Sequence, residues 1–429
     1  MTAPELCIMK RLLVLSFTFF LTAKGFSQEA RRLTLQQAEQ EFLQRNFRLL
    51  AERYRVNASE ALVEQAKKWD NPTVSGTLGF GTLEAVKPFN IGGGGQLEGN
   101  VEQIIQLAGK RNKQVQLAKW NASASAAAFT ELMRTLRLEL RTNFYQLYFL
   151  QASEKTLREQ LSNLQRILDA YRTADATGSV AHADVIRLQA LQVGIANDYT
   201  DLRQQEMDAS LRLQLLTGSK EPIKPESDPD VLRRYKLGFQ TLQSLTDTAL
   251  ANRPDLQLAG YQLEAAKSNQ RLQQALAVPD LHLGATYDRN GSYAPNFIGL
   301  TLGVDLPVWN RNQGNIKAAA QEVKAQSAGL SQQQFTIAAE VANALGKVQF
   351  LEQGTGWPDL HSFNAEYTRL IEEVAANFRK GNISLLQFID YFNSYSEHIR
   401  HANKFLSDRV QAYEELNFTT GVQLFNQLQ

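Results

Sequence analysis

The sequence predicts an α+β membrane protein made of two tandem structural repeats, in which long α-helices form a coiled-coil barrel and four β-strands per chain join a β-barrel. Three observations lead to this fold class: an internal repeat, four segments of alternating apolar and small or polar residues, and helical stretches too long for a globular domain. The mean hydropathy of -0.32 is ordinary for a soluble chain. The fold class therefore rests on pattern and not on composition.

Charge and residue usage exclude one class of partner. The 429 residues carry 45 Lys and Arg against 44 Asp and Glu, which gives a net charge of +1. This balance provides no basic field for nucleic acid phosphates, so we expect no nucleic-acid partner. Only 11 prolines occur, a usage typical of long helices.

The N-terminus has the layout of a secretory signal, and we expect residues 1–27 to be a cleaved signal peptide. Two basic residues precede an apolar run over residues 12–21, and small residues follow it. The run is shorter than the ~20 apolar residues of a spanning helix. Translation starts at Met1 or Met9. The single cysteine, Cys7, precedes the run, so we predict neither a disulfide nor a lipid anchor.

An internal repeat organises the whole chain. An offset of 207 places Leu35, Asn46, Tyr54, Ala58 and Pro72 on Leu242, Arg253, Tyr261, Ala265 and Pro279. Residues 110–112 match 310–312 at an offset of 200, and Gly178, Thr217 and Gly218 match Gly381, Thr420 and Gly421 at 203. We therefore expect a first repeat over residues 28–218, a linker over 219–241 and a second repeat over 242–429.

Each repeat is expected to begin with a helix that is followed by two strands. The helices are predicted over residues 33–68 and 242–277, and a proline a few residues later ends each one. Alternation predicts strands over residues 73–80, 96–106, 281–288 and 298–306. The first pair is less regular than the second, with a flexible glycine run over residues 92–95 between its strands.

Helical hairpins of unusual length follow the strands. The predicted outgoing and return helices are residues 112–173 and 185–202 in the first repeat and residues 315–379 and 386–399 in the second. At ~1.5 Å per residue, sixty residues span about 90 Å, which indicates coiled-coil hairpins. The hairpin turns hold Gly178 and Gly381. Residues 354–358 contain glycine and proline and are expected to interrupt the outgoing helix of the second repeat.

The strands predict assembly from several copies of the chain. Each alternating segment is about ten residues long, the length of a tilted membrane-spanning strand. Four strands cannot close, because the smallest spanning barrels have ~8 and an open edge in lipid leaves backbone groups unpaired at several kcal/mol each. Copies must pool eight, twelve or sixteen strands. A water-soluble sandwich of the same strands is the competing interpretation.

Several short motifs recur in a fixed order along the chain. They are Leu-Ala-Gly-Lys-Arg at residues 107–111, Asn-Arg-Pro-Asp-Leu at 252–256, Leu-Pro-Val-Trp-Asn-Arg-Asn-Gln-Gly at 306–314, and the repeat ends at 216–218 and 418–421. With the duplicated layout, the chain resembles the TolC-type outer-membrane efflux proteins, closest to the heavy-metal (CzcC-like) branch of resistance-nodulation-division tripartite systems. The resemblance implies a homotrimer with a twelve-stranded barrel and a periplasmic helical tunnel. Its implied partners are a periplasmic adaptor, an inner-membrane pump and outer-membrane lipid.

Three groups of residues are candidates for specific roles, and the resemblance implies the first of these roles. The hairpin turns would contact the adaptor through Thr177, Gly178, Ser179, Val180, Lys380, Gly381, Asn382 and Ile383, although a glycine at a helix end is a C-cap in any case. The aperture candidates are Glu372, Glu373, Arg379 and Asp390, which otherwise form one solvated hairpin face. The strand-to-helix turns hold Gly109, Lys110, Arg111, Asn310, Arg311, Asn312 and Gly314, where glycine supplies backbone freedom.

The sequence predicts no catalytic site and no metal site. His398 and His401 are three residues apart on a predicted helix, but no cysteine or methionine cluster accompanies them, so we interpret them as surface histidines. Phosphate loops, nucleophile elbows and paired catalytic carboxylates are not found in a strand-to-helix context. We expect neither enzymatic activity nor a cofactor.

The expected function is a passive outer-membrane duct that exports metal ions or small toxic compounds received from the pump and the adaptor. Two alternatives stay open at this point. The first is the outer-membrane duct of a type I protein secretion system, which passes polypeptide. The second is a periplasmic coiled-coil scaffold. Sequence alone leaves the transported substrate, the partner pump and the resting aperture open.

Overall fold

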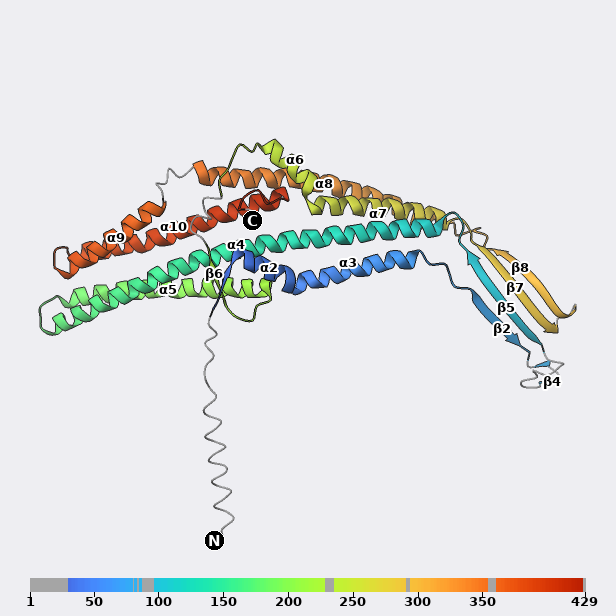
Figure 1. Ribbon diagram of the computed structural model, residues 1–429, viewed down its shortest axis with the longest axis horizontal. Helices are drawn as coiled ribbons and strands as arrows, with labels where there is room; N and C mark the ends of the chain where they lie inside the picture. The colour runs from blue at the N-terminus through green and yellow to red at the C-terminus, as the bar shows by residue number, and fades with distance from the viewer. Residues whose placement is uncertain are drawn as a thin grey trace, which may run out of the picture. The chain divides into compact units, whose positions relative to one another are not determined.

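The computed structural model describes residues 30–79, 81–82, 85–86, 96–227, 235–290, 294–353 and 360–426 (Figure 1). The expected signal peptide lies outside these ranges. The described chain contains long helices, one four-stranded sheet and two small two-stranded sheets. Within it, no helix is long and apolar enough to cross a membrane.

The first expected helix is divided in two and is preceded by a strand. β1 (Arg31–Thr34) leads into α2 (Leu35–Arg45), and α3 (Phe47–Ala66) begins after a break at Asn46. Asn46 has an extended backbone, and its side chain accepts a hydrogen bond from the Leu49 N–H at 3.0 Å. This N-cap satisfies one of the free donors at the start of α3. The prediction of one continuous helix here was wrong.

The same break recurs in the second repeat. α6 (Leu242–Asn252) is capped by the Thr241 side chain, and α7 (Pro254–Leu276) begins after a break at Arg253. Proline at the first position of α7 fits there, because that position has no intrahelical partner for an N–H. The single helix expected over residues 242–277 is therefore two helices.

The four predicted strands are present and form one antiparallel sheet. They are β2 (Thr73–Leu78), β5 (Leu97–Ile105), β7 (Leu281–Asn290) and β8 (Pro295–Val304). Their order in the sheet is β2-β5-β7-β8, and each neighbouring pair is antiparallel. β3 (Gly81–Thr82) and β4 (Ala85–Val86) form a separate small antiparallel pair. Strands from both repeats thus share a sheet.

A further strand lies in the segment that was expected to be only a linker. β6 (Ile223–Glu226) pairs in parallel with β1, and Arg31 is opposite Ile223. Leu33 and Ile223 are each 2% exposed, so this pair contributes to the core of its unit. Two four-residue strands this far apart in sequence give no periodic signal, which explains why the pair was not predicted.

The long helices confirm the duplication. They are α4 (Lys110–Ala176), α5 (His182–Thr217), α8 (Gln313–Gln353), α9 (Leu360–Arg379) and α10 (Leu385–Thr420). The boundaries of α4 and α5 recur in the second repeat with one constant shift of 203 residues. Lys110 and Ala176 correspond to Gln313 and Arg379, and His182 and Thr217 correspond to Leu385 and Thr420. The interruption expected over residues 354–358 lies outside the described residues.

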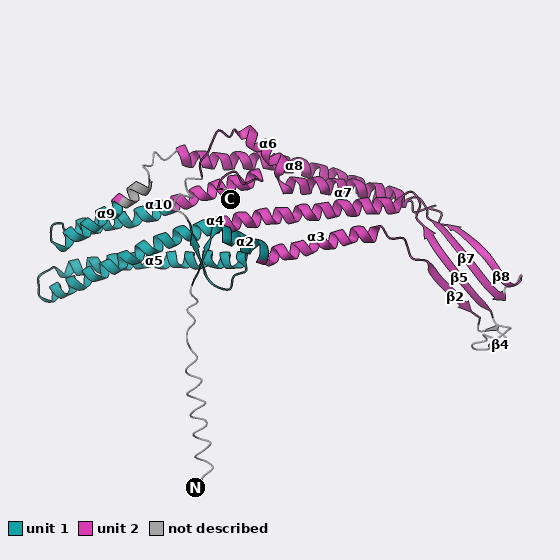
Figure 2. Cartoon of the chain, in the orientation of Figure 1, with its two compact units in different colours: residues 1–44, 143–228, 367–403 teal, residues 45–142, 229–366, 404–429 magenta. Residues whose placement is uncertain are grey.

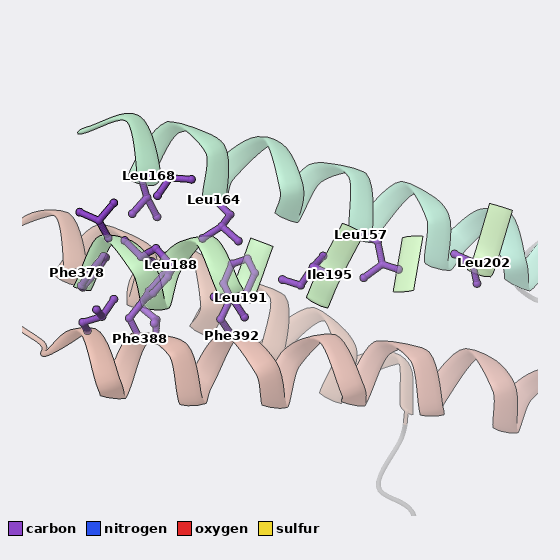
Figure 3. Packing of buried hydrophobic residues seen from close by; sticks show 14 residues of the cluster. Leu157, Leu164, Leu168, Leu188, Leu191, Ile195, Leu202, Phe378, Phe388 and Phe392 are labelled. Atoms are coloured by element: carbon purple, nitrogen blue, oxygen red, sulfur yellow. The ribbon is translucent and has the colours of Figure 1, made fainter. Parts of the chain in front are cut away.

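Packing divides the chain into two compact units (Figure 2), and each unit draws on both repeats. The first unit holds residues 1–44, 143–228 and 367–403, and the second holds residues 45–142, 229–366 and 404–429. In the first unit, apolar side chains of α4 and α5 pack against those of α9 and α10 (Figure 3). Leu164, Leu188 and Phe388 are fully buried there.

The second unit contains the sheet and its own helical core. One face of α8 is buried at Ile337, Val341, Ala344 and Val348, spaced three or four residues apart as on a single helical stripe. α7 packs along α8.

Candidate functional site

The first hairpin turn is closed by a Schellman motif, in which a left-handed residue follows the helix end. Gly178 has a φ of 69°, and its N–H donates to the Asp175 carbonyl at 2.9 Å. The Ser179 N–H donates to the Ala174 carbonyl at 2.9 Å. His182 Nδ1 lies 2.8 Å from Asp175 Oδ2 across the turn. The turn is thus a fixed structure built mainly by the backbone.

The second hairpin turn has the same motif. Gly381 has a φ of 74°, and its N–H donates to the Phe378 carbonyl at 3.0 Å. The Asn382 N–H donates to the Asn377 carbonyl at 2.9 Å. The Ser384 hydroxyl then caps the start of α10. The two glycines therefore have the same backbone role in the two repeats.

Replacing Gly381 by alanine tests this role. We expect Gly381→Ala to destabilise the turn by about 1 kcal/mol, because a Cβ disfavours positive φ, although nothing lies within 4 Å of it. Hydrogen exchange at the turn amides should quicken by about fivefold. Gly329→Ala is the matched control. Gly329 lies within α8 and also has open space around it, so alanine there should stabilise the helix. Equal effects of the two changes would contradict the assignment.

Six of the eight predicted turn residues are exposed. These are Thr177, Gly178, Ser179, Lys380, Gly381 and Asn382. Val180 and Ile383 are instead half-buried and pack against the hydrophobic core of the first unit. They hold the turns onto their hairpins, which leaves the other six as accessible surface.

A groove of about 720 Å³ lies beside both turns, between α4 and α9. Its lining includes Tyr171 and Phe378, whose rings stack with centroids 5.5 Å apart at an angle of 12°. Burial, with a smaller contribution from the Asp184 carboxylate, raises the pKa of the Tyr171 hydroxyl. Phe378 and Phe388 stack next to it (Figure 3). The groove is therefore aromatic at its base and open to solvent.

The four aperture candidates are all exposed, and the structure brings only two of them together. Glu372 and Arg379 line the groove, whereas Glu373 and Asp390 do not. Burial, together with the Asp390 carboxylate, raises the pKa of the Tyr367 hydroxyl. In a single chain these charges form no closed cluster.

The first strand-to-helix turn is held by a buried ion pair. Ala108 and Gly109 have φ values of 56° and 65°, and α4 begins at Lys110. Lys110 Nζ lies 2.7 Å from Asp280 Oδ1, with the lysine side chain 5% exposed. The Leu107 N–H donates to the same oxygen at 2.9 Å. Lys110 thus connects the turn after β5 to the start of β7.

The second strand-to-helix turn is held by asparagine. Asn312 has a φ of 58°, and its Nδ2 donates to the Gln273 carbonyl at 2.7 Å. Its N–H donates to Asn310 Oδ1 at 3.1 Å. Arg311 is exposed, and its N–H donates to Gln313 Oε1 at 2.8 Å.

This geometry corrects two expectations. Gly314 lies inside α8, and the backbone freedom expected from it is supplied by Asn312. Gly109 and Asn312 are the left-handed residues directly before the two helices, at the same shift of 203 as the helices themselves. The sequence match of residues 110–112 to 310–312 was therefore three residues out of register.

The strand register gives the sheet one apolar and one polar face, because alternate residues of a strand point to opposite sides. The mainly apolar face holds Val74, Leu78, Leu97, Val101, Ile105, Leu281, Leu283, Tyr287, Ile298, Leu300, Leu302 and Val304, with Gln103 as a polar exception. The mainly polar face holds Thr73, Ser75, Thr77, Glu98, Asn100, Glu102, His282, Thr286, Asp288 and Thr301, with Ile104 and Phe297 as apolar exceptions. Leu300 is 89% exposed and Ile298 is 76% exposed. So large an exposed apolar face marks a surface that contacts lipid or protein.

His398 and His401 both lie on α10. His398 is half-buried, and burial followed by the charge of His401 lowers the pKa of its imidazole. Its ring lies edge-on to Tyr367, with centroids 5.1 Å apart. In the part of the chain that the structure describes, no group of three or more His, Cys, Asp and Glu side chains is placed to hold a metal ion.

The duplicated layout has a counterpart in known sequences. Residues 38–219 and 245–421 each match the family described as outer membrane efflux protein. The chain belongs to the outer membrane efflux protein family. Members of this family are channels, and the two matches follow the two repeats.

Curated relatives within the family are distant in sequence. The pyoverdine export outer membrane protein OpmQ of Pseudomonas putida is 26% identical over 54% of this chain and 50% of its own length. The cobalt-zinc-cadmium resistance protein CzcC of Cupriavidus metallidurans is 21% identical over 69% of this chain and 68% of its own length. The matched region thus spans about half the length of the OpmQ protein.

Solved structures of outer membrane efflux channels share the fold. The crystal structure of CusC superposes with a TM-score of 0.72 at 18% identity, over 93% of this chain and 96% of that one. The Campylobacter jejuni CmeC outer membrane channel superposes with a TM-score of 0.71 at 15% identity, over 92% of this chain and 87% of that one.

An ionic cluster around a buried arginine in this efflux protein was not foreseen from its sequence. The Arg253 side chain is 2% exposed, and its guanidinium pairs with Asp255 and, at 2.6 Å, with Glu340 Oε2. Burial favours the neutral carboxyl, but the hydrogen bond and charge of Arg253 hold the pKa of Asp255 below its usual value. The Asn-Arg-Pro-Asp-Leu motif at residues 252–256 was the available signal, and its structural role is to fix the α6–α7 break.

Proposed function

We propose that the protein is the outer membrane channel subunit of a tripartite efflux system and acts as a passive duct without catalysis. One observation carries this proposal. Four antiparallel strands present a largely apolar, exposed face, and the sheet ends in β2 on one side and β8 on the other. In lipid, every unpaired backbone group at such edges costs several kcal/mol, so other copies must complete the sheet.

Strand direction supports closure by identical copies. Because all three pairings are antiparallel, β2 and β8 run in opposite directions. The β8 strand of one copy can therefore pair antiparallel with the β2 strand of the next, and the ring continues without a break in pattern. Three copies give the twelve strands that we propose for the barrel.

An apolar stripe on α5 supports the same assembly. Ile186, Val193 and Met207 are spaced by multiples of seven residues and are 50%, 60% and 65% exposed. Leu211 and Leu215 continue the stripe at 53% and 69% exposure. A heptad-spaced face is typical of a helix that packs on a neighbouring helix, and we propose that a second copy covers it.

We propose that the hairpin turns contact the periplasmic adaptor, through which an inner-membrane pump delivers cargo. The six exposed turn residues are held by rigid backbone motifs, and the aromatic groove lies next to them. Glu372, Glu373, Arg379 and Asp390 are exposed, so three-fold repetition would place each of them in a ring able to pair between copies. Opening would separate these rings.

Metal cations are the cargo that we favour, because the polar face of the sheet is acidic. Glu98 and Asp288 lie directly opposite each other in the register, and Glu102 is on the same face. Like charges in such a pair are destabilising, and rings of carboxylates favour cations in a pore. A relative named for cobalt, zinc and cadmium resistance is consistent with this choice.

Neutralising these carboxylates should change ion selectivity. The triple variant Glu98→Gln, Glu102→Gln, Asp288→Asn is expected to lower the cation-to-anion permeability ratio severalfold, measured as a shift in reversal potential across a planar bilayer. Glu226→Gln, outside the four-stranded sheet, is the control and should leave the ratio unchanged. An unaltered ratio in the triple variant would refute the acidic lumen.

We further propose that residues 1–27 direct export and are removed, and that the mature chain reaches the outer membrane. Residues 28–218 and 242–429 would then act as repeats joined by residues 219–241. The alternation and signal patterns support this route. N-terminal sequencing of the outer-membrane form tests the cleavage.

A deletion strain tests the function. We expect sensitivity to at least one of divalent metals, monovalent copper and silver, or hydrophobic drugs, and a detergent-dependent, heat-modifiable trimer with single-channel conductance. If no compound sensitises the strain but a secreted polypeptide is lost, the type I secretion duct replaces this proposal. A monomer that is fully soluble without detergent and forms no channel would support the scaffold.

A further inference from the structure

A small polar pocket lies where α3 ends, before β2, and where β5 turns into α4. It has a volume of about 110 Å³. Its lining includes Lys68, Trp69 and Asp70 from the end of α3 and Gln106 and Arg111 from the facing turn. All of these residues belong to the second unit. The pocket therefore sits at the helix-side end of the apolar sheet face.

One side of the pocket is cationic. The Arg111 guanidinium lies over the Trp69 ring, 3.8 Å from its centroid, and Lys68 is exposed beside it. In the described chain, neither Arg111 nor Lys68 is within ion-pair distance of a carboxylate. A stacked, uncompensated guanidinium next to an ammonium is the arrangement that recognises a phosphate.

The other side of the pocket accepts hydrogen bonds. Gln106 Nε2 donates to Asp70 Oδ2 at 2.9 Å, which fixes the orientation of the amide. Gln106 Oε1 is then buried and has no hydrogen-bond partner among the described residues. The exposed Asp70 carboxylate on this side suits a ligand with a cationic N–H donor.

The second repeat shows that the fold does not require the basic side chains or the tryptophan. The ends of α3 and α7, at Ala66 and Leu276, differ by 210 residues, so Lys68, Trp69 and Asp70 correspond to Val278, Pro279 and Asp280. At the offset of 203, Arg111 corresponds to Gly314. The equivalent positions thus keep the carboxylate but lack Lys68, Trp69 and Arg111, so the cationic side of the pocket is an addition to the first repeat.

We propose that this pocket binds the headgroup of phosphatidylethanolamine in the periplasmic leaflet of the outer membrane, an inference that rests on the proposed membrane channel. Lys68 and Arg111 hold the phosphate, and the Asp70 carboxylate accepts hydrogen bonds from the ammonium group. The zwitterionic headgroup matches both sides of the pocket at once. Three copies would hold three such lipids.

Two neighbouring features favour a membrane lipid over a free phosphoethanolamine. Trp69 is 64% exposed, and tryptophan at the end of a spanning strand is typical of the membrane interface. Val74, on the apolar face of β2 only a few residues further on, is 74% exposed. A headgroup in the pocket would therefore have an apolar surface beside it for its acyl chains.

Lipid titration of the purified, delipidated trimer tests the proposal. Native mass spectrometry should show dioleoyl phosphatidylethanolamine bound about tenfold more tightly than dioleoyl phosphatidylcholine, whose quaternary ammonium has no N–H to donate. The double variant Lys68→Gln, Arg111→Gln should lose about tenfold in affinity for phosphatidylethanolamine. Asp70→Asn should reduce the preference between the two lipids.

Controls keep the test decisive. Lys324→Gln removes an exposed charge from α8 and should leave lipid binding unchanged. If the double variant fails to fold, the variant Lys68→Val, Arg111→Gly replaces it, because the second repeat has Val278 and Gly314 at the equivalent positions. Equal retention by wild type and variant, or equal binding of the two lipids, would overturn the proposal. Competition by glycerophosphoethanolamine at equal concentration would overturn the lipid assignment.

Channel recordings on the same preparation separate the two proposals. A wild-type protein that forms channels but shows no lipid preference rejects only the lipid site. A wild-type protein that forms no channels rejects the proposed function itself, whatever lipid it retains.

Discussion

Replacing Glu414 by glutamine should destabilise the folded protein by about 3–5 kcal/mol, because it removes the carboxylate charge that pairs with the buried Arg141 guanidinium. Arg141 Nε donates to Glu414 Oε1 at 2.9 Å, and the two side chains are 3% and 1% exposed. The Tyr235 hydroxyl donates to the same oxygen at 2.6 Å, and Asn417 Nδ2 donates to Oε2 at 3.1 Å. Glutamine is isosteric, so the loss comes from charge and not from packing.

The cluster also fastens the end of the described chain. Arg141 Nη2 donates to the Asn426 carbonyl at 2.9 Å, and Asn417 Oδ1 accepts from the Phe425 N–H at 3.0 Å. Burial raises the pKa of the neighbouring Tyr413 to about 12, so this hydroxyl stays neutral at ordinary pH. We therefore expect protease cleavage after α10 to quicken in Glu414→Gln before global unfolding is seen.

Guanidinium titration of helical circular dichroism in detergent measures the effect. Asp408→Asn is the matched control on α10, because its ion pair with Lys404 has side chains 69% and 43% exposed. Such a pair contributes at most about 1 kcal/mol. The double variant Arg141→Met, Glu414→Leu should recover much of the loss, since apolar side chains replace a buried ion pair well. Equal effects of Glu414→Gln and Asp408→Asn would contradict the argument.

Periodic features were predictable from the sequence, because period and burial are linked directly. The alternation over residues 281–288 placed β7 correctly, and the long helix predicted over residues 112–173 matches α4. Both patterns extend over several turns or pleats, so one misplaced residue does not erase them. The order of the strands across two repeats could be expected only from the duplication.

Features that depend on single residues were harder to predict. Asn46 caps the start of α3, and Arg253 precedes the proline that begins α7, so each residue separates two helices. Neither residue interrupts the apolar pattern around it. β1 and β6 are four residues each, too short to show a period. The Arg141–Glu414 pair links helix faces 273 residues apart, which local patterns cannot register.

At the strand-to-helix turns, sequence identity gave a different register from the one in the structure. Residues 310–312 and 110–112 share an Arg-Asn step, and this identity set the sequence register at an offset of 200. The structure aligns Gly109 with Asn312, because both occupy the left-handed position directly before a helix. Asparagine tolerates that conformation better than other residues with a side chain, so it can replace glycine there.

An arginine at position 300 should prevent insertion of the sheet into the membrane. Leu300 is 89% exposed on the apolar face and lies opposite Ala285 in the register. An arginine on the lipid face of a membrane barrel costs about 2–4 kcal/mol near the midplane, and a trimer would carry three of them. We expect Leu300→Arg to reduce the heat-modifiable trimer in outer-membrane fractions to a small residue.

The neighbouring residue supplies the decisive control. Thr301 is also exposed, but it lies opposite Gly284 on the polar face, so an arginine there would point into the lumen. Thr301→Arg introduces the same charge as Leu300→Arg, in the same strand and at nearly the same depth. We expect this variant still to assemble, but with a lower cation conductance. Only a sheet with one lipid face and one water face predicts opposite outcomes for adjacent positions. If both variants assembled equally, or both failed equally, the assignment of the two faces would be wrong, and the closure of β8 onto β2 of another copy would lose its physical basis.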